Sequence, residues 1–196
     1  PRRWGKSSLV QKAAAEAMVK DKELRFCFLD AFNIRTEEQF YQMLAVEVLK
    51  LSASKIEILF ENAKRFLSAF LPKLSYNPGN QEELSLSLDW KEVKKHPDAI
   101  LNMAETVAVE NGWKLVICID EFQNISTFEN PLAFQKKLRS HWQKHQHVAY
   151  CLYGSKRHML MDVFTSSSMP FYKFGDILFL TKISKESWIP FICQRF

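Results

Sequence analysis

Short runs of apolar residues alternate along the chain with longer segments in which apolar positions recur every three or four residues. Three of the runs are continuous: FCFL at 26–29, LVICI at 115–119 and VAYCLY at 148–153. Continuous apolar runs of this length are typical of parallel strands that are covered on both faces. With helical segments between them, they predict an α/β protein whose mostly parallel sheet lies between layers of helices.

The helices are predicted from periodicity and from signals at their ends. Thr36 and Gln39 are spaced as a capping box, and Gly112 stands where a helix would end. The stretch SYNPGNQEE at 75–83 predicts a loop, and the alternation in LSLSLDW at 84–90 and the run ILFL at 177–180 predict weaker strands. The predicted helices are 7–22, the segment after Thr36, 54–71, 97–111, 130–144, 156–164 and a last one that starts at Ser184.

Composition excludes a disordered chain, because 47% of the 196 residues are hydrophobic and 25% are charged. The net charge of +5 permits an anionic partner such as a nucleotide or nucleic acid, although lysines and arginines spread over helical faces give the same total. The four cysteines, Cys27, Cys118, Cys151 and Cys193, have no C-x-x-C spacing and favour reduced thiols in a cytoplasmic protein. No apolar run approaches the roughly 20 residues of a membrane helix, so we expect no membrane association.

Gly5, Lys6, Ser7 and Ser8 form the second half of the phosphate-binding pattern G-x-x-x-x-G-K-[ST] and lead into a predicted helix. Backbone N–H groups at that helix N-terminus and the Lys6 ammonium would bind phosphates, and the Ser7 hydroxyl would bind magnesium. The first glycine of the pattern would fall one place before Pro1. We therefore expect the chain to start inside its phosphate loop, without the strand that anchors it, and by itself to bind ATP poorly.

Asp120 and Glu121 follow directly after the most apolar run. Two carboxylates at the end of a buried strand are costly unless something there needs negative charge, or unless the strand simply leaves the core at a solvated loop. Beside a phosphate loop, Asp120 would hold the magnesium ion through water and Glu121 would be the general base for an attacking water. The extra strand predicted at 25–30, between the two motifs, suits P-loop ATPases better than small-molecule kinases.

His141, His145 and His147 are close enough in sequence to suggest a metal site. Lys144 lies among them, so a solvated helix end, where positive charge suits the helix dipole, is the favoured interpretation.

Four segments together resemble the prokaryotic AAA+-type ATPases called the archaeal ATPase family, which are related to STAND nucleotide switches and origin-recognition ATPases. They are PRRWGKSSL, LVICIDEFQNI, LYGSKRHMLMDVF and PFYKFGDILFL, and the resemblance covers nearly the whole chain. It implies a P-loop NTPase three-layer sandwich that lacks its first strand here. It also implies an ATPase core at 1–183 and the start of a C-terminal helical or winged-helix region at 184–196.

The resemblance also implies roles for individual residues. Ser155, after Tyr153 and Gly154, takes the sensor position, and the family's usual Gly-Arg after Pro-Phe-Tyr is replaced by Lys173 and Phe174. The expected catalytic residues are Glu121 and Lys6, and the expected metal ligands are Ser7 and Asp120. The expected nucleotide contacts are Arg3, Trp4, Gly5, Lys6, Ser7, Ser8 and Ser155.

The expected function is magnesium-dependent ATP binding and hydrolysis, coupled to a conformational change in a partner or a C-terminal domain. One alternative is a STAND-type nucleotide switch with slow turnover. A small-molecule kinase is another, and it would transfer phosphate to an acceptor without depending on Glu121. Besides ATP, the partners we expect are a protein or DNA bound through regions outside this chain, and further copies in a homo-oligomer.

Overall fold

The computed structural model describes residues 5–52, 62, 65, 73–74, 86–87, 91 and 97–195. Within these ranges, three parallel strands form a sheet in the order β1-β4-β5. They are β1 (Leu24–Asp30), β4 (Lys114–Asp120) and β5 (Val148–Leu152), and a short antiparallel pair is made by β2 (Lys73–Leu74) and β3 (Leu86–Ser87). The three strands predicted from continuous apolar runs are therefore confirmed.

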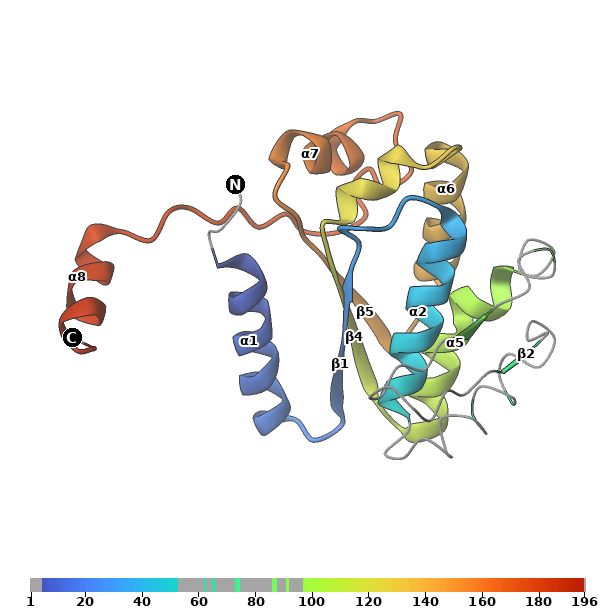
Figure 1. Ribbon diagram of the computed structural model, residues 1–196, viewed down its shortest axis with the longest axis horizontal. Coiled ribbons are helices and arrows are strands. Elements are labelled where there is room, and N and C mark those ends of the chain that lie inside the picture. Colours follow the sequence, from blue (N-terminus) through green and yellow to red (C-terminus); the bar gives the residue numbers. More distant parts are fainter. Residues whose placement is uncertain are drawn as a thin grey trace.

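Helices connect the strands of the sheet and cover both of its faces (Figure 1). The described helices are α1 (Lys6–Lys20), α2 (Glu37–Leu51), α5 (Pro97–Asn111), the 3-10 helix η2 (Phe122–Thr127), α6 (Pro131–Trp142), α7 (Arg157–Thr165) and α8 (Lys185–Cys193). α1 lies on one side of the sheet, and α2, α5 and α6 lie on the other. This arrangement is the predicted three-layer α/β sandwich. No helix of the described ranges combines the length and the apolar character needed to cross a bilayer.

Alternate residues of each strand point to opposite faces and enter different apolar layers. Leu29, Ile117 and Ile119 belong to the main core, which also holds the buried residues of α2, α5 and α6. Cys118 and Ala14 are equally buried but lie outside that core. They belong to the thinner layer between the sheet and α1, where Ala14 is the one buried residue of the helix.

The predicted helix ends are largely confirmed. Thr36 Oγ1 accepts a hydrogen bond from Gln39 N at 3.2 Å, but the Gln39 side chain accepts from Arg35 N at 2.7 Å rather than from Thr36 N. The return hydrogen bond of the capping box therefore comes from the backbone N–H of Arg35, one residue before Thr36. Gly112 has φ 65°, the left-handed conformation that glycine adopts at helix C-termini.

The strand predicted at 177–180 and the segments predicted at 54–71 and 75–83 are not confirmed. The predicted strand at 177–180 is wrong for the described chain, because these residues belong to no strand, and 175–195 are exposed throughout. Strand propensity in ILFL cannot by itself supply the hydrogen-bonding neighbour that a strand requires. The predicted helix at 54–71 and loop at 75–83 lie almost wholly outside the described residues.

Candidate functional site

The residues of the expected phosphate loop and the acidic pair meet at one edge of the sheet. Gly5 has φ 73°, and α1 begins directly after it. Ser7 Oγ donates a hydrogen bond to Asp120 Oδ2 at 2.5 Å, across a separation of 113 residues in sequence. The structure therefore brings together the two motifs that the sequence singles out, at the carboxyl ends of parallel strands.

At the end of β4, the side chains of Asp120 and Glu121 point in different directions. Asp120 Oδ1 accepts from the backbone N–H of Glu121 at 2.8 Å, and Asp120 pairs in register with Asp30 at the end of β1. Glu121 has φ 51°, a left-handed conformation that is uncommon for a residue with a side chain. This turn ends the strand, starts η2 and points the two carboxylates at different partners.

The carboxylate of Glu121 is held by donors from two other segments. Its Oε2 accepts from Ser155 Oγ at 2.9 Å, from Ser155 N at 3.3 Å and from Gln123 Nε2. Burial alone would raise the pKa of Glu121, but these hydrogen bonds and the positive charge of Lys6 outweigh it and lower the pKa. Glu121 is therefore an ionised, oriented carboxylate.

Gln123 is the residue of this site that sequence reasoning missed. It is completely buried, and its amide reaches Glu121 past Gly154, which has no side chain to block it. The available signal was a polar residue between the apolar Phe122 and Ile125, since a buried amide needs a specific partner.

The other expected nucleotide contacts are placed only in part. Ser8 is exposed in the first turn of α1, beside Ser7, and Lys6 is half-buried at the helix start. Arg3 and Trp4 lie outside the described residues. The structure thus positions the part of the expected loop that begins at Gly5.

The oxygen atoms at this edge fit a magnesium ion that is shared with a phosphate. A serine hydroxyl and a carboxylate are hard oxygen ligands, and Mg²⁺ is usually bound by one or two carboxylates together with phosphate oxygens and water. Across the described ranges, no group of three or more His, Cys, Asp or Glu side chains is placed to hold a metal ion. The Ser7 hydroxyl and the Asp120 carboxylate, 2.5 Å apart, are oxygen ligands of the kind that Mg²⁺ takes.

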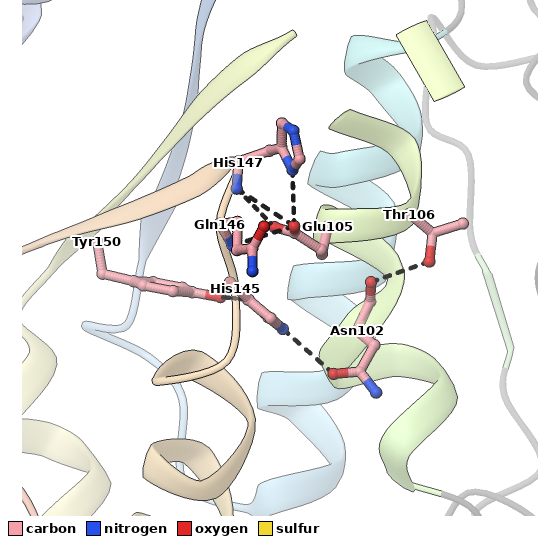
Figure 2. Close-up of polar contacts among 7 residues, drawn as sticks. All are labelled: Asn102, Glu105, Thr106, His145, Gln146, His147 and Tyr150. Atoms are coloured by element: carbon pink, nitrogen blue, oxygen red, sulfur yellow. Dashed lines mark hydrogen bonds and ion pairs between the residues drawn. The ribbon is translucent and has the colours of Figure 1, made fainter. Parts of the chain in front are cut away.

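The three neighbouring histidines are not a solvated helix end but make specific contacts with α5. His141 Nε2 lies 3.0 Å from Asp98 Oδ1, and His147 Nδ1 lies 2.9 Å from Glu105 Oε1. Glu105 also accepts from the backbone N–H groups of Gln146 and His147 (Figure 2). These contacts hold the turn before β5 against α5, at the edge of the sheet opposite Ser7 and Asp120.

His145 lies between Tyr150 of β5 and Asn102 of α5. Its Nδ1 lies 2.8 Å from Tyr150 Oη and its Nε2 lies 3.2 Å from Asn102 Oδ1, as Figure 2 shows. Burial lowers the pKa of His145, with Glu105 opposing and His141 reinforcing the effect. The neutral ring, donating from Nε2 and accepting at Nδ1, satisfies both neighbours.

No family model matches the sequence, and no curated protein matches it. The chain is similar to the solved structure of a Walker-type ATPase of Pyrococcus abyssi, with a TM-score of 0.54 and 20% identity over 98% of this chain and 50% of that one. It is also similar to the ORC2 protein of Aeropyrum pernix, solved in ADPNP-ADP complexes, with a TM-score of 0.54 and 16% identity over 98% of this chain and 42% of that one.

The chain thus spans half or less of the length of these two solved structures. At such identities the likeness concerns the fold. The predicted likeness to archaeal and origin-recognition ATPases is confirmed at this level: the chain has the α/β fold of P-loop ATPases.

Proposed function

We propose that this chain is the nucleotide-binding core of an AAA+-like ATPase that binds ATP with Mg²⁺ and hydrolyses it. The observation that carries the proposal is the contact between Ser7 Oγ and Asp120 Oδ2, which joins the start of α1 to the end of β4. A magnesium ion on ATP needs a hydroxyl and a carboxylate at this point of a P-loop fold. The fold shared with two archaeal proteins, one of them solved with ADPNP and ADP, supports the same conclusion.

The phosphates would bind at the N-terminus of α1. Its first backbone N–H groups have no partner within the helix, and together with the Lys6 ammonium they offer positive charge to the β- and γ-phosphates. Arg3, Trp4, Gly5 and Ser8 belong to the same proposed loop. Ser7 and Asp120 would hold the ion, which supplies charge neutralisation on the transferred phosphate.

Glu121 would act as the general base. Its pKa is lowered, so the side chain is ionised at neutral pH and able to accept a proton from a water molecule. Ser155, through two hydrogen bonds, fixes the direction of the carboxylate. A lowered pKa also makes the carboxylate a weaker base, so the same contacts limit the rate of the step.

One observation favours the slow-turnover switch as a second candidate. Ser155 and Gln123 together give three hydrogen bonds to Oε2 of Glu121, so moving this carboxylate oxygen toward a water molecule would break those bonds. A base held in this way suits a protein whose bound nucleotide sets its shape. In either case we place the boundary of the ATPase core at residue 183, and the exposed α8 would carry the nucleotide state to a protein or DNA partner.

The test is phosphate release by the full-length protein with Mg²⁺ and ATP. Glu121→Gln should bind ATP and lower the turnover rate by about 10²–10⁴-fold, and Lys6→Ala should lose ATP binding. Glu129→Gln, at an exposed glutamate beyond η2, is the matched control and should leave the rate unchanged. An undiminished rate in Glu121→Gln would remove Glu121 from its role, and the absolute rate, with the masses of the apo, ADP and ATP forms, separates the ATPase from the switch.

A further inference from the structure

Two thiols lie side by side on the sheet, just below the nucleotide-binding edge. Cys118 in β4 and Cys151 in β5 are register partners on neighbouring parallel strands. Register partners on such strands point to the same face of the sheet. We propose that Cys118 and Cys151 are a redox-sensitive modification site, which peroxide converts into a reversible disulfide.

The strand geometry brings the two residues within disulfide range. Neighbouring strands lie about 4.8 Å apart, and the Cα atoms of disulfide-bonded cysteines are usually about 4.4–6.8 Å apart. Both side chains leave the sheet on the same face, so a bond between the two sulfurs needs no change of strand register. Cys27 cannot take part, because it enters the main core on the other face, and Cys193 is exposed on α8.

The two thiols are unequal, and this sets the order of the chemistry. Cys118 is fully buried, whereas Cys151 is half-buried and is the one an oxidant reaches first. The hydrogen bond from Cys118 lowers the pKa of Cys151, whereas the same contact and burial raise the pKa of Cys118, so Cys151 is the thiol that ionises more readily.

The reaction consumes one hydrogen peroxide molecule. The Cys151 thiolate attacks one peroxide oxygen, the O–O bond breaks, and the departing hydroxide takes up a proton to form water. The sulfur of Cys118 then attacks the resulting sulfenic acid, so that the S–S bond forms and the S–O bond breaks. The leaving hydroxide takes the Cys118 proton as a second water, and both sulfurs are oxidised by one electron while peroxide is reduced by two.

The position of the pair ties its redox state to the proposed nucleotide site. Cys118 lies two residues before Asp120 and points to the same face, and β5 leads directly to Ser155. A bond between these strands would draw together the two segments that Glu121 and Ser155 already join. The expected effect on turnover, which rests on the proposed function, is a loss of up to about 10²-fold from misplaced catalytic groups.

The test of the disulfide needs no nucleotide. The folded full-length protein is treated with hydrogen peroxide, its free thiols are blocked, and its tryptic peptides are analysed by mass spectrometry without reduction. We expect the peptide 115–136 to be joined to the peptide 145–156, and dithiothreitol to release both. Cys151→Ser and Cys118→Ala should abolish the joined peptide, whereas Cys27→Ser and Cys193→Ser should retain it.

Recovery of both peptides with blocked free thiols, under conditions that oxidise the exposed Cys193, would overturn the proposal, as would a bridge to another cysteine. Turnover is measured on the same samples. A bridged protein whose normal turnover rate is unaffected by oxidation would overturn the link to the nucleotide site. A protein that forms the bridge but never hydrolyses ATP would instead overturn the proposed function.

Discussion

Gly154 leaves open the space that the Gln123 amide occupies: a Cβ at position 154 would lie 1.9 Å from Gln123 Oε1. The amide is completely buried there and donates from Nε2 to Glu121. Any larger residue at 154 must therefore displace Gln123 or the strand end. The glycine after β5 and the glutamine after β4 are one structural unit that sets the direction of Glu121.

The first prediction is that Gly154→Ala and Gln123→Ala are coupled. Gly154→Ala should lower the free energy of unfolding by about 1–3 kcal/mol, because the new methyl group overlaps a buried side chain. Gln123→Ala removes the overlapped atoms, so the double variant should be more stable than the sum of the two single effects predicts, by at least about 0.5 kcal/mol. Urea unfolding of the four proteins measures this coupling.

Gly175→Ala is the matched control, because nothing lies within 4 Å of a Cβ at that exposed glycine. Its effect should stay within about 0.5 kcal/mol. Additive effects of Gly154→Ala and Gln123→Ala would mean that the two side chains do not compete for space.

The pattern of the sequence was sufficient to predict the sheet and the edge at which the motifs meet. A continuous apolar run such as 115–119 records burial on both faces, and the carboxyl ends of parallel strands necessarily share an edge, so the meeting of Ser7 and Asp120 followed. The contacts of Glu121 could not be predicted in this way. They depend on its left-handed backbone and on a turn 34 residues later, and neither leaves a periodic signal.

The histidine contacts escaped prediction for a related reason. A histidine at a helix end reads the same in sequence whether it faces water or a neighbouring helix. Except for Tyr150 of β5, the residues that face these histidines come from α5, some 40 residues earlier, and they meet the histidines only once α5 packs beside α6. Local propensity contains no information on such pairings.

The second prediction concerns the pH dependence of turnover. Ser155→Ala removes a hydroxyl that stabilises the ionised form of Glu121, so the pKa of Glu121 should rise. A base with a higher pKa becomes protonated sooner as the pH falls. The acid limb of the single-turnover pH profile should therefore move to higher pH, while Ser168→Ala, at an exposed serine after α7, should leave it in place. A limb that moves to lower pH in Ser155→Ala would show that Ser155 does not act on the ionised carboxylate.

The third prediction concerns the pH dependence of stability. Burial would raise the pKa of Glu105, but hydrogen bonds from His147 and from the backbone of Gln146 and His147 lower it. A carboxyl whose folded pKa lies below its unfolded value stabilises the fold above the unfolded pKa, near 4.5, and loses that contribution as the pH falls through the folded value. Glu105→Gln should therefore lower the free energy of unfolding more at pH 7 than at pH 3.5.

Urea unfolding at the two pH values measures the difference. Glu16→Gln, at an exposed glutamate of α1, should change stability equally little at both. A larger loss for Glu105→Gln at pH 3.5 than at pH 7 would contradict the sign derived from the lowered pKa.

The fourth prediction concerns the segment that follows α7. Arg139, near the end of α6, donates from Nη1 to the carbonyl oxygens of Pro170 and Tyr172, the latter at 3.0 Å, and its guanidinium lies 5.4 Å from the centre of the Phe174 ring. A lysine ammonium has neither the planar fork nor the stacking face of arginine. Arg139→Lys should therefore loosen residues 170–174 and lower the free energy of unfolding by about 1.5–3 kcal/mol, the usual range for hydrogen bonds to a charged group.

Hydrogen exchange separates this local effect from general destabilisation. In Arg139→Lys, the amides of Tyr172 and Phe174 should exchange faster. The amides of β4 should lose no more protection than the fall in the global free energy of unfolding accounts for. Arg157→Lys is the matched control. The Arg157 guanidinium lies over the ring of the exposed Phe179, outside residues 170–174. Equal protection of 170–174 in Arg139→Lys and the unaltered protein would show that the buried Phe171, rather than Arg139, holds the segment on α6.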